Sequence, residues 1–150
     1  MTDEHGPDIP EQRKYLPTLA ELIDRLSIVQ LKMIFIGDNR EFYEKERADI
    51  EHDITMTMDR WQKVFSGLDI RAILILMLTN RYIWENESKA RAGGPEQDKL
   101  LKLTHSVNGI RSQAKNIIAR SMGERVDLKT DCFAAELEKE FGNWNVFNDA

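Results

Sequence analysis

Helical spacing of the apolar residues is the feature that most constrains how this chain can fold. In four long stretches the apolar side chains recur every three or four residues, which places them on one face of an α-helix. No stretch shows the apolar and polar alternation that is typical of a β-strand. Short glycine-containing turns between long helices favour antiparallel neighbours. We therefore predict an all-α fold: an antiparallel bundle of four long helices, followed by a short C-terminal helix and an aromatic tail.

Capping patterns and glycines indicate where the helices begin and end. Thr18 and Glu21 form the capping-box pattern T-x-x-E at the start of the first helix, which Gly37 terminates. Asp69 is a candidate cap for the third helix, which follows the break at Gly67. The remaining expected boundaries are residues 40–66 for the second helix, a stop at 93–95 for the third, 96–122 for the fourth and 131–141 for the short helix.

Composition indicates one globular domain after a polar arm. The chain has 150 residues, of which 41% are hydrophobic and 31% charged, as in ordinary soluble domains. Residues 1–16 are proline-containing and polar, so we expect a flexible N-terminal arm before a single helical domain at 17–150. The net charge of −5 argues against nucleic acid as the partner. No apolar run approaches the roughly 20 residues that cross a bilayer, so we expect a cytoplasmic protein without membrane contact.

Cysteine and histidine usage predicts neither a metal nor a cofactor. The single cysteine, Cys132, excludes an internal disulfide and a cysteine-based zinc site within one chain. Three scattered histidines lack the spacing of a metal site. We interpret Cys132 as a small buried side chain near the start of a helix.

Charge is distributed unevenly between the second and fourth helices. The second is rich in carboxylates, whereas the stretch from Lys99 to Arg120 contains none. One interpretation is that the two helices lie side by side and neutralise each other. The other is an anion site on the fourth helix, where Asn108, Arg111 and Lys115 flank the apolar stripe.

Polar residues also interrupt the apolar surface of the first helix. Arg25 and Lys32 share one face at positions i and i+7, and Asp24 and Ser27 share the adjacent face. Asp24 is either a buried salt-bridge partner of an arginine, Arg91 or Arg111, or a group that orients a ligand hydroxyl.

The third helix changes from apolar to polar along a single face. Its first part reads IRAILILMLT, and the face of Ile73 and Met77 then continues through Asn80, Trp84, Glu87 and Arg91. A tryptophan on a helix belongs either to the core or to a binding platform. In the second case the indole would stack on a base or sugar while the guanidinium meets a phosphate.

Three motifs resemble an uncharacterised helical family of bacteria and phages. They are ELIDRLSIVQLK at 21–32, N-x-x-x-W-x-x-E-x-x-x-R at 80–91 and N-x-x-R-x-x-x-K-x-x-I at 108–118, together 35 of the 150 residues. Because members of that family tend to lie near genes for sugar transfer, the resemblance implies a connection with sugars or nucleotide sugars. The chain departs from the family pattern in its aromatic content after Lys32 and in its tail. The site residues that the resemblance carries over are Asp24, Arg25, Ser27, Lys32, Asn80, Trp84, Glu87, Arg91, Asn108, Arg111 and Lys115.

We expect a non-enzymatic, homo-oligomeric protein that binds, and in one version sequesters, a small anionic ligand between its helices. The ligand would be a nucleotide, a cyclic nucleotide signal or a sugar phosphate, and a phage anti-defence protein is one concrete version. The five cations of the set would meet phosphates, Trp84 would stack, and the other polar groups would fix hydroxyls or base edges. Two alternatives remain: a small all-α nucleotide or sugar-phosphate hydrolase that uses Asp24 and Glu87, and an oligomeric interaction module built on the acidic helix and the 141–147 tail.

Overall fold

Four helices make up the described part of the chain, with no strand among them. The structure, a computed structural model, describes residues 14–126. The helices are α1 (Leu19–Phe35), α2 (Arg40–Trp61), α3 (Gly67–Arg91) and α4 (Gln97–Met122). The predicted all-α architecture is thereby confirmed. The expected N-terminal arm, short C-terminal helix and aromatic tail lie wholly or largely outside the described residues.

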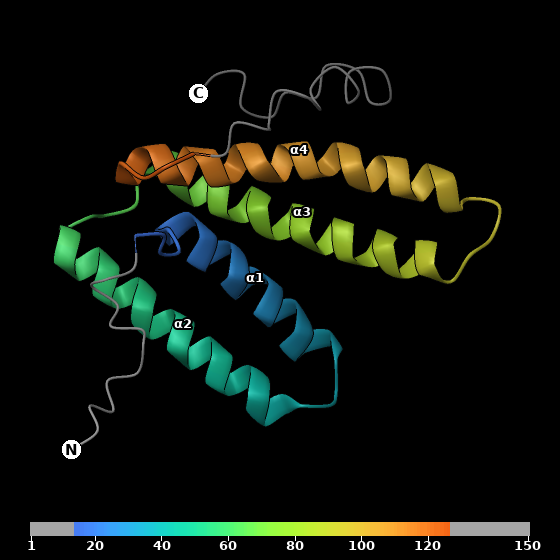
Figure 1. The fold of residues 1–150 in the computed structure, drawn as a ribbon, viewed down its shortest axis with the longest axis horizontal. Helices are drawn as coiled ribbons and strands as arrows, with labels where there is room; N and C mark the ends of the chain where they lie inside the picture. Colours follow the sequence, from blue (N-terminus) through green and yellow to red (C-terminus); the bar gives the residue numbers. More distant parts are fainter. Residues whose placement is uncertain (1–13, 127–150) are drawn as a thin grey trace.

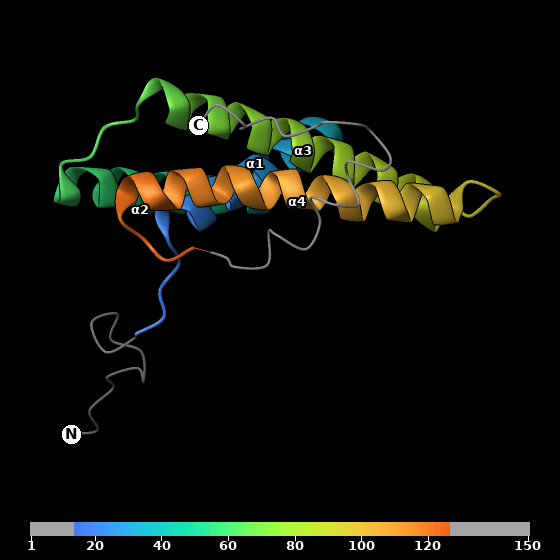
Figure 2. The same ribbon diagram turned by 90° about the horizontal axis from the view of Figure 1, so that it is seen from above.

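Successive helices run in opposite directions, but they do not form a square bundle. Figure 1 shows α3 and α4 side by side and antiparallel, with α2 returning along α1. Seen from above, α1 lies beneath the α3–α4 pair (Figure 2). Among the described residues the backbone of α2 lies close to that of α1 but not to that of α3 or α4, and Ile54 and Met58 of α2 pack against the edge of the core. The interpretation that the acidic second helix neutralises the basic fourth helix is therefore wrong, because α1 stands between them.

The main apolar core lies where α1 begins, α3 begins and α4 ends. Small side chains bring α3 and α4 close together, and larger ones from α1 fill the space between them. Farther along the chain α1 diverges from the other two helices (Figure 1). The buried members of the core are Leu19, Ala20, Ile23, Ala72, Leu76, Ala114, Ile118, Ala119 and Met122.

Two of the predicted helix ends are corrected by the structure. α2 ends at Trp61 rather than near residue 66, because Gln62 adopts a left-handed conformation with φ of 50° and its N–H bonds back to Asp59 O and Met58 O. α3 begins at Gly67 because Ser66 is its cap, accepting a bond from the N–H of Asp69 at 3.1 Å. Asp69 is thus the third residue of a capping box rather than the cap.

Other predicted boundaries agree closely with the structure. The capping box of Thr18 and Glu21 is present, with the Glu21 N–H donating to Thr18 Oγ1 at 3.1 Å. Gly123 ends α4 with φ of 72°, a conformation that favours glycine. Only Ile50 is buried in α2, which agrees with the solvated character expected for its first half.

Candidate functional site

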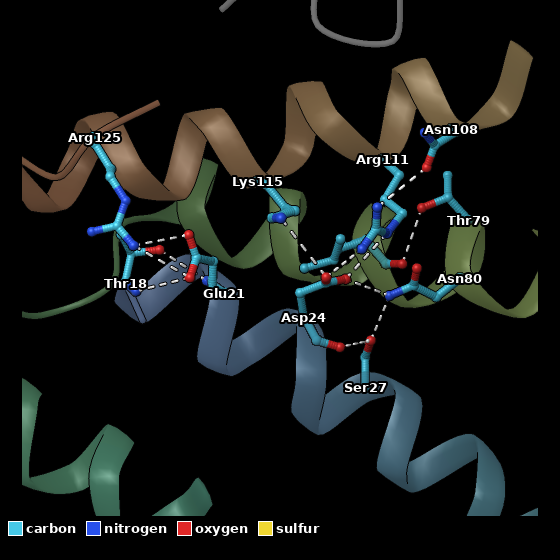
Figure 3. A network of polar contacts seen from close by, with 11 residues as sticks. Thr18, Glu21, Asp24, Ser27, Thr79, Asn80, Asn108, Arg111, Lys115 and Arg125 are labelled. Carbon is cyan, nitrogen blue, oxygen red and sulfur yellow. Dashed lines mark hydrogen bonds and ion pairs between the residues drawn. The ribbon is translucent and has the colours of Figure 1, made fainter. Parts of the chain in front are cut away.

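Asp24 is the centre of a polar network that joins α1, α3 and α4 (Figure 3). Its side chain is buried, and Arg111 of α4 binds it with two nitrogens: Nη2 contacts Oδ2, and Nε donates to Oδ1 at 3.2 Å. Lys115 Nζ lies 3.8 Å from the same Oδ2. A buried carboxylate is stable only when it is paired and hydrogen-bonded, and this one is both.

Asn80 of α3 completes the network from the opposite side. Its amide nitrogen donates to Asp24 Oδ1 at 2.8 Å and to Ser27 Oγ at 2.6 Å. Ser27 Oγ in turn donates to the backbone oxygen of Asp24 at 2.7 Å. Both amide hydrogens of Asn80 are thus used, so the amide is held in one orientation.

Arg111 is held in place by Asp24 and by Asn108 one helical turn before it. Its Nη1 donates to Asn108 Oδ1 at 3.2 Å. A guanidinium has five N–H groups, and the bonds to Asp24 and Asn108 use three of them. Arg111 therefore keeps donors for a further acceptor.

A pocket opens next to this network, where α1 diverges from α3 and α4. Its volume is about 290 Å³, at the lower end of the range for small-molecule sites. Apolar residues from α1 and α3 form much of the wall, and a lysine, an arginine, two amides and a carboxylate supply its polar groups. The lining residues are Ile28, Leu31, Lys32, Asn80, Ile83, Trp84, Glu87, Asn108 and Arg111.

Trp84 is half-buried and lines the pocket. One side of its indole packs on Phe35 at the end of α1, with 5.6 Å between the ring centroids. The Arg81 guanidinium lies 5.1 Å from the centroid of the Phe35 ring. These contacts fix the indole while leaving part of it to line the pocket. Trp84 therefore belongs to the pocket wall rather than to the main apolar core, and its role as a binding platform stays a prediction.

The structure brings nine of the eleven predicted site residues to one place. Lys32, Trp84 and Glu87 line the pocket, and the others form or border the network. Arg25 lies apart, because its Nε donates to Glu46 Oε1 of α2 at 2.9 Å. Arg91 also lies apart: its side chain is 81% exposed, and its nearest carboxylate is Glu87 at 3.8 Å. Asp24 pairs with Arg111, one of the two arginines proposed as its partner.

The apolar half of the pocket wall is not distinguished in the amino-acid sequence. Ile28, Leu31 and Ile83 belong to the same three-and-four spacing as the core residues, so spacing alone does not separate them. A second polar cluster was missed as well. Glu124, just after α4, accepts the N–H of Leu19 with both carboxylate oxygens at 2.8 and 2.9 Å, and it joins the start of α1 to the end of α4. Burial raises the pKa of Glu124, although bonds from the N–H groups of Leu19 and Ala20 oppose the shift.

Within residues 14–126, no group of three or more His, Cys, Asp or Glu side chains is arranged to hold a metal ion. No helix in the same part of the chain combines the length and apolar character needed to span a bilayer. The chain matches none of the protein-family models, curated proteins or solved structures with which it was compared, so the resemblance in motifs to a family of bacteria and phages remains a prediction.

Proposed function

We propose that the pocket between α1, α3 and α4 binds a small anionic ligand such as a nucleotide, a cyclic nucleotide signal or a sugar phosphate. The observation that supports this most directly is the placement of Arg111. Its guanidinium is fixed by Asp24 and Asn108, these bonds leave two of its N–H groups unused, and Arg111 is one of the residues that line the pocket. A preoriented guanidinium is well suited to a phosphate or carboxylate group.

The charges around the pocket also favour an anion. Lys32, Arg111 and Lys115 stand against the carboxylates of Asp24 and Glu87, which leaves one net positive charge in the neighbourhood. Because the site is partly enclosed by apolar residues, this charge is less screened than it would be on an open surface. The ligand would place its anionic group between Lys32 and Arg111.

The rest of the wall suits a ligand that has both a flat or apolar part and hydroxyl or N–H donors. The indole of Trp84 and the side chains of Ile83 and Leu31 offer apolar contact, and the Glu87 carboxylate accepts hydrogen bonds. The volume of about 290 Å³ fits a mononucleotide or a monosaccharide phosphate better than a dinucleotide. Sequestration of such a molecule, as in a phage anti-defence protein, is one biological version of this proposal.

The hydrolase alternative has less support. Both oxygens of Asp24 already interact with Arg111, and Asn80 donates to one of them, so Asp24 is poorly placed to serve as a base or as a metal ligand. Incubating the protein with AMP or glucose 1-phosphate and Mg²⁺ tests this alternative, and release of inorganic phosphate would favour it. We expect binding without turnover.

Calorimetric titration of wild type and two matched variants tests the proposal. The probes are AMP, cyclic AMP and glucose 1-phosphate. Lys32→Gln removes a pocket cation, whereas Arg25→Gln removes a cation from the same helix that lies outside the pocket. We expect at least one probe to bind wild type, and Lys32→Gln to weaken its affinity about tenfold or more. Arg25→Gln should bind like wild type; equal losses in both variants, or no binding of any probe, would contradict the proposal.

A further inference from the structure

The outward face of α3 carries an apolar row that no described helix covers. Ile70, Leu74, Leu78 and Tyr82 follow one another at intervals of four residues and are 48%, 60%, 67% and 37% exposed. They span about 18 Å along the helix axis. A helix that is apolar all round normally has all its faces buried, and the first half of α3 is apolar on nearly every face.

The inner faces of α3 are already occupied. Ala72, Leu76 and Thr79 are buried in the seam with α4, and Asn80 bonds to Asp24 of α1. The exposed row lies on the opposite side, away from both neighbours and from the pocket. It therefore belongs neither to the core nor to the proposed ligand site, and an apolar row left exposed by the described helices marks an interaction surface.

We propose that this row is the interface of a homodimer in which α3 packs antiparallel against α3 of a second copy, with Leu78 on the two-fold axis. Such an interface is isologous, so the row must be complementary to itself. Pairing about Leu78 places Leu74 opposite Tyr82 of the other copy on both sides of the axis. Leucine and aromatic side chains then fill the centre of the contact.

The charges that flank the row favour this direction and this register. The antiparallel pairing about Leu78 brings Arg71 of each copy opposite Glu85 of the other. Glu85 accepts a bond from Arg81 Nε of its own chain at 3.0 Å, so it would be shared by two arginines. A parallel pairing would instead set Arg71 beside Arg71 and Arg81 beside Arg81, and such like-charge contacts are unfavourable.

Sedimentation velocity of the full chain tests the interface, with a matched control variant. Leu78→Glu places a charge on the axis, and Ile34→Glu places one on α1 at a side chain with nearly the same exposure, 68% against 67%. We expect wild type and Ile34→Glu to sediment as dimers and Leu78→Glu to sediment as a folded monomer, with its helicity checked by circular dichroism. A monomeric wild type, or dissociation by Ile34→Glu but not by Leu78→Glu, would overturn the proposal.

Cross-linking tests the register without relying on a destabilising charge. In a Cys132→Ser background, Leu78→Cys should form a disulfide-linked dimer on mild oxidation, because the two positions meet at the axis. Leu74→Cys alone should not cross-link, whereas Leu74→Cys combined with Tyr82→Cys should. Cross-linking of the Leu74→Cys variant alone would refute the register. If wild type is a monomer whose melting temperature falls strongly with Leu78→Glu, another segment of the same chain covers the row and the dimer is refuted.

Discussion

A single carboxylate, that of Asp24, joins three helices, so removing one of its partners should lower the free energy of unfolding. Arg111→Met would leave the buried charge of Asp24 with only Lys115 at 3.8 Å and the amide of Asn80. We expect the free energy of unfolding, measured by urea denaturation, to fall by about 3 kcal/mol, the lower end for breaking a buried ion pair. Arg25→Met, which breaks the exposed pair with Glu46, should cost less than about 1 kcal/mol.

Removing both partners separates packing from the cost of an unpaired charge. The double variant Asp24→Leu with Arg111→Met should recover part of the stability lost by Arg111→Met alone, because the buried carboxylate is removed together with its main partner, while Lys115 and the Asn80 N–H lose Asp24 as a partner. A double variant as unstable as the single one would show that the pair stabilises the fold by its own attraction. That result would contradict the explanation that Arg111→Met is destabilising mainly because it leaves the buried charge of Asp24 without its main partner.

Glu124 should make stability depend on pH. Burial raises its pKa in the folded protein above the ordinary value of 4.5, which the unfolded chain retains. The folded state therefore binds this proton more tightly, so the contribution is present below the ordinary pKa and is lost as pH rises through the folded pKa. We compare the free energy of unfolding of wild type with that of Glu124→Gln from about pH 4 to pH 7. As pH rises, the value for wild type should fall relative to the value for the variant. A difference that stays constant, or shifts the other way, would contradict this assignment.

At the level of the helices, local chemistry explains which ends were predictable. The capping box of Thr18 and Glu21 and the glycine at 123 are strong signals, and both ends lie where expected. The end of α2 carries no such signal, because Gln62 takes the left-handed conformation in which glycine is usual. Its helical spacing places Phe65 in that helix, but Phe65 lies in the loop that follows and packs there against the core. Tertiary packing, rather than local preference, stops α2 at this point.

The end of α2 therefore offers a way to stabilise the protein. Gln62 has φ of 50° and Asn39 has φ of 60°, but asparagine tolerates this region better than glutamine does. Gln62→Gly should raise the free energy of unfolding by about 0.5–1 kcal/mol, and Asn39→Gly should raise it by less. Thermal and urea denaturation of the two variants check the order. A larger gain from Asn39→Gly would contradict the explanation.

At the level of the whole molecule, helix faces predicted most of the site but not its shape. Asn80, Trp84 and Glu87 face the pocket as their spacing indicates, but Arg91, one turn later on the same face, lies beyond it. Arg25 and Lys32 share a face, and α2 contacts both: Arg25 bonds to Glu46, and the Lys32 ammonium lies 5.7 Å from the centroid of the Tyr43 ring. Of the two, Lys32 alone also lines the pocket, because it lies where α1 leaves the other helices. The divergence of α1 and the position of α2 depend on which helices contact each other, and spacing within one helix does not contain that information.

Native mass spectrometry of the full chain purified from its host tests the central claim, that the pocket holds a small anion, most directly. We predict that wild type and Arg25→Gln carry a small molecule that is released on denaturation. Lys32→Gln should carry much less of it, because Lys32 lines the pocket whereas Arg25 lies outside it. The same spectrum reports the number of subunits. A wild type free of any bound molecule, or equal occupancy in Lys32→Gln and Arg25→Gln, would contradict the account.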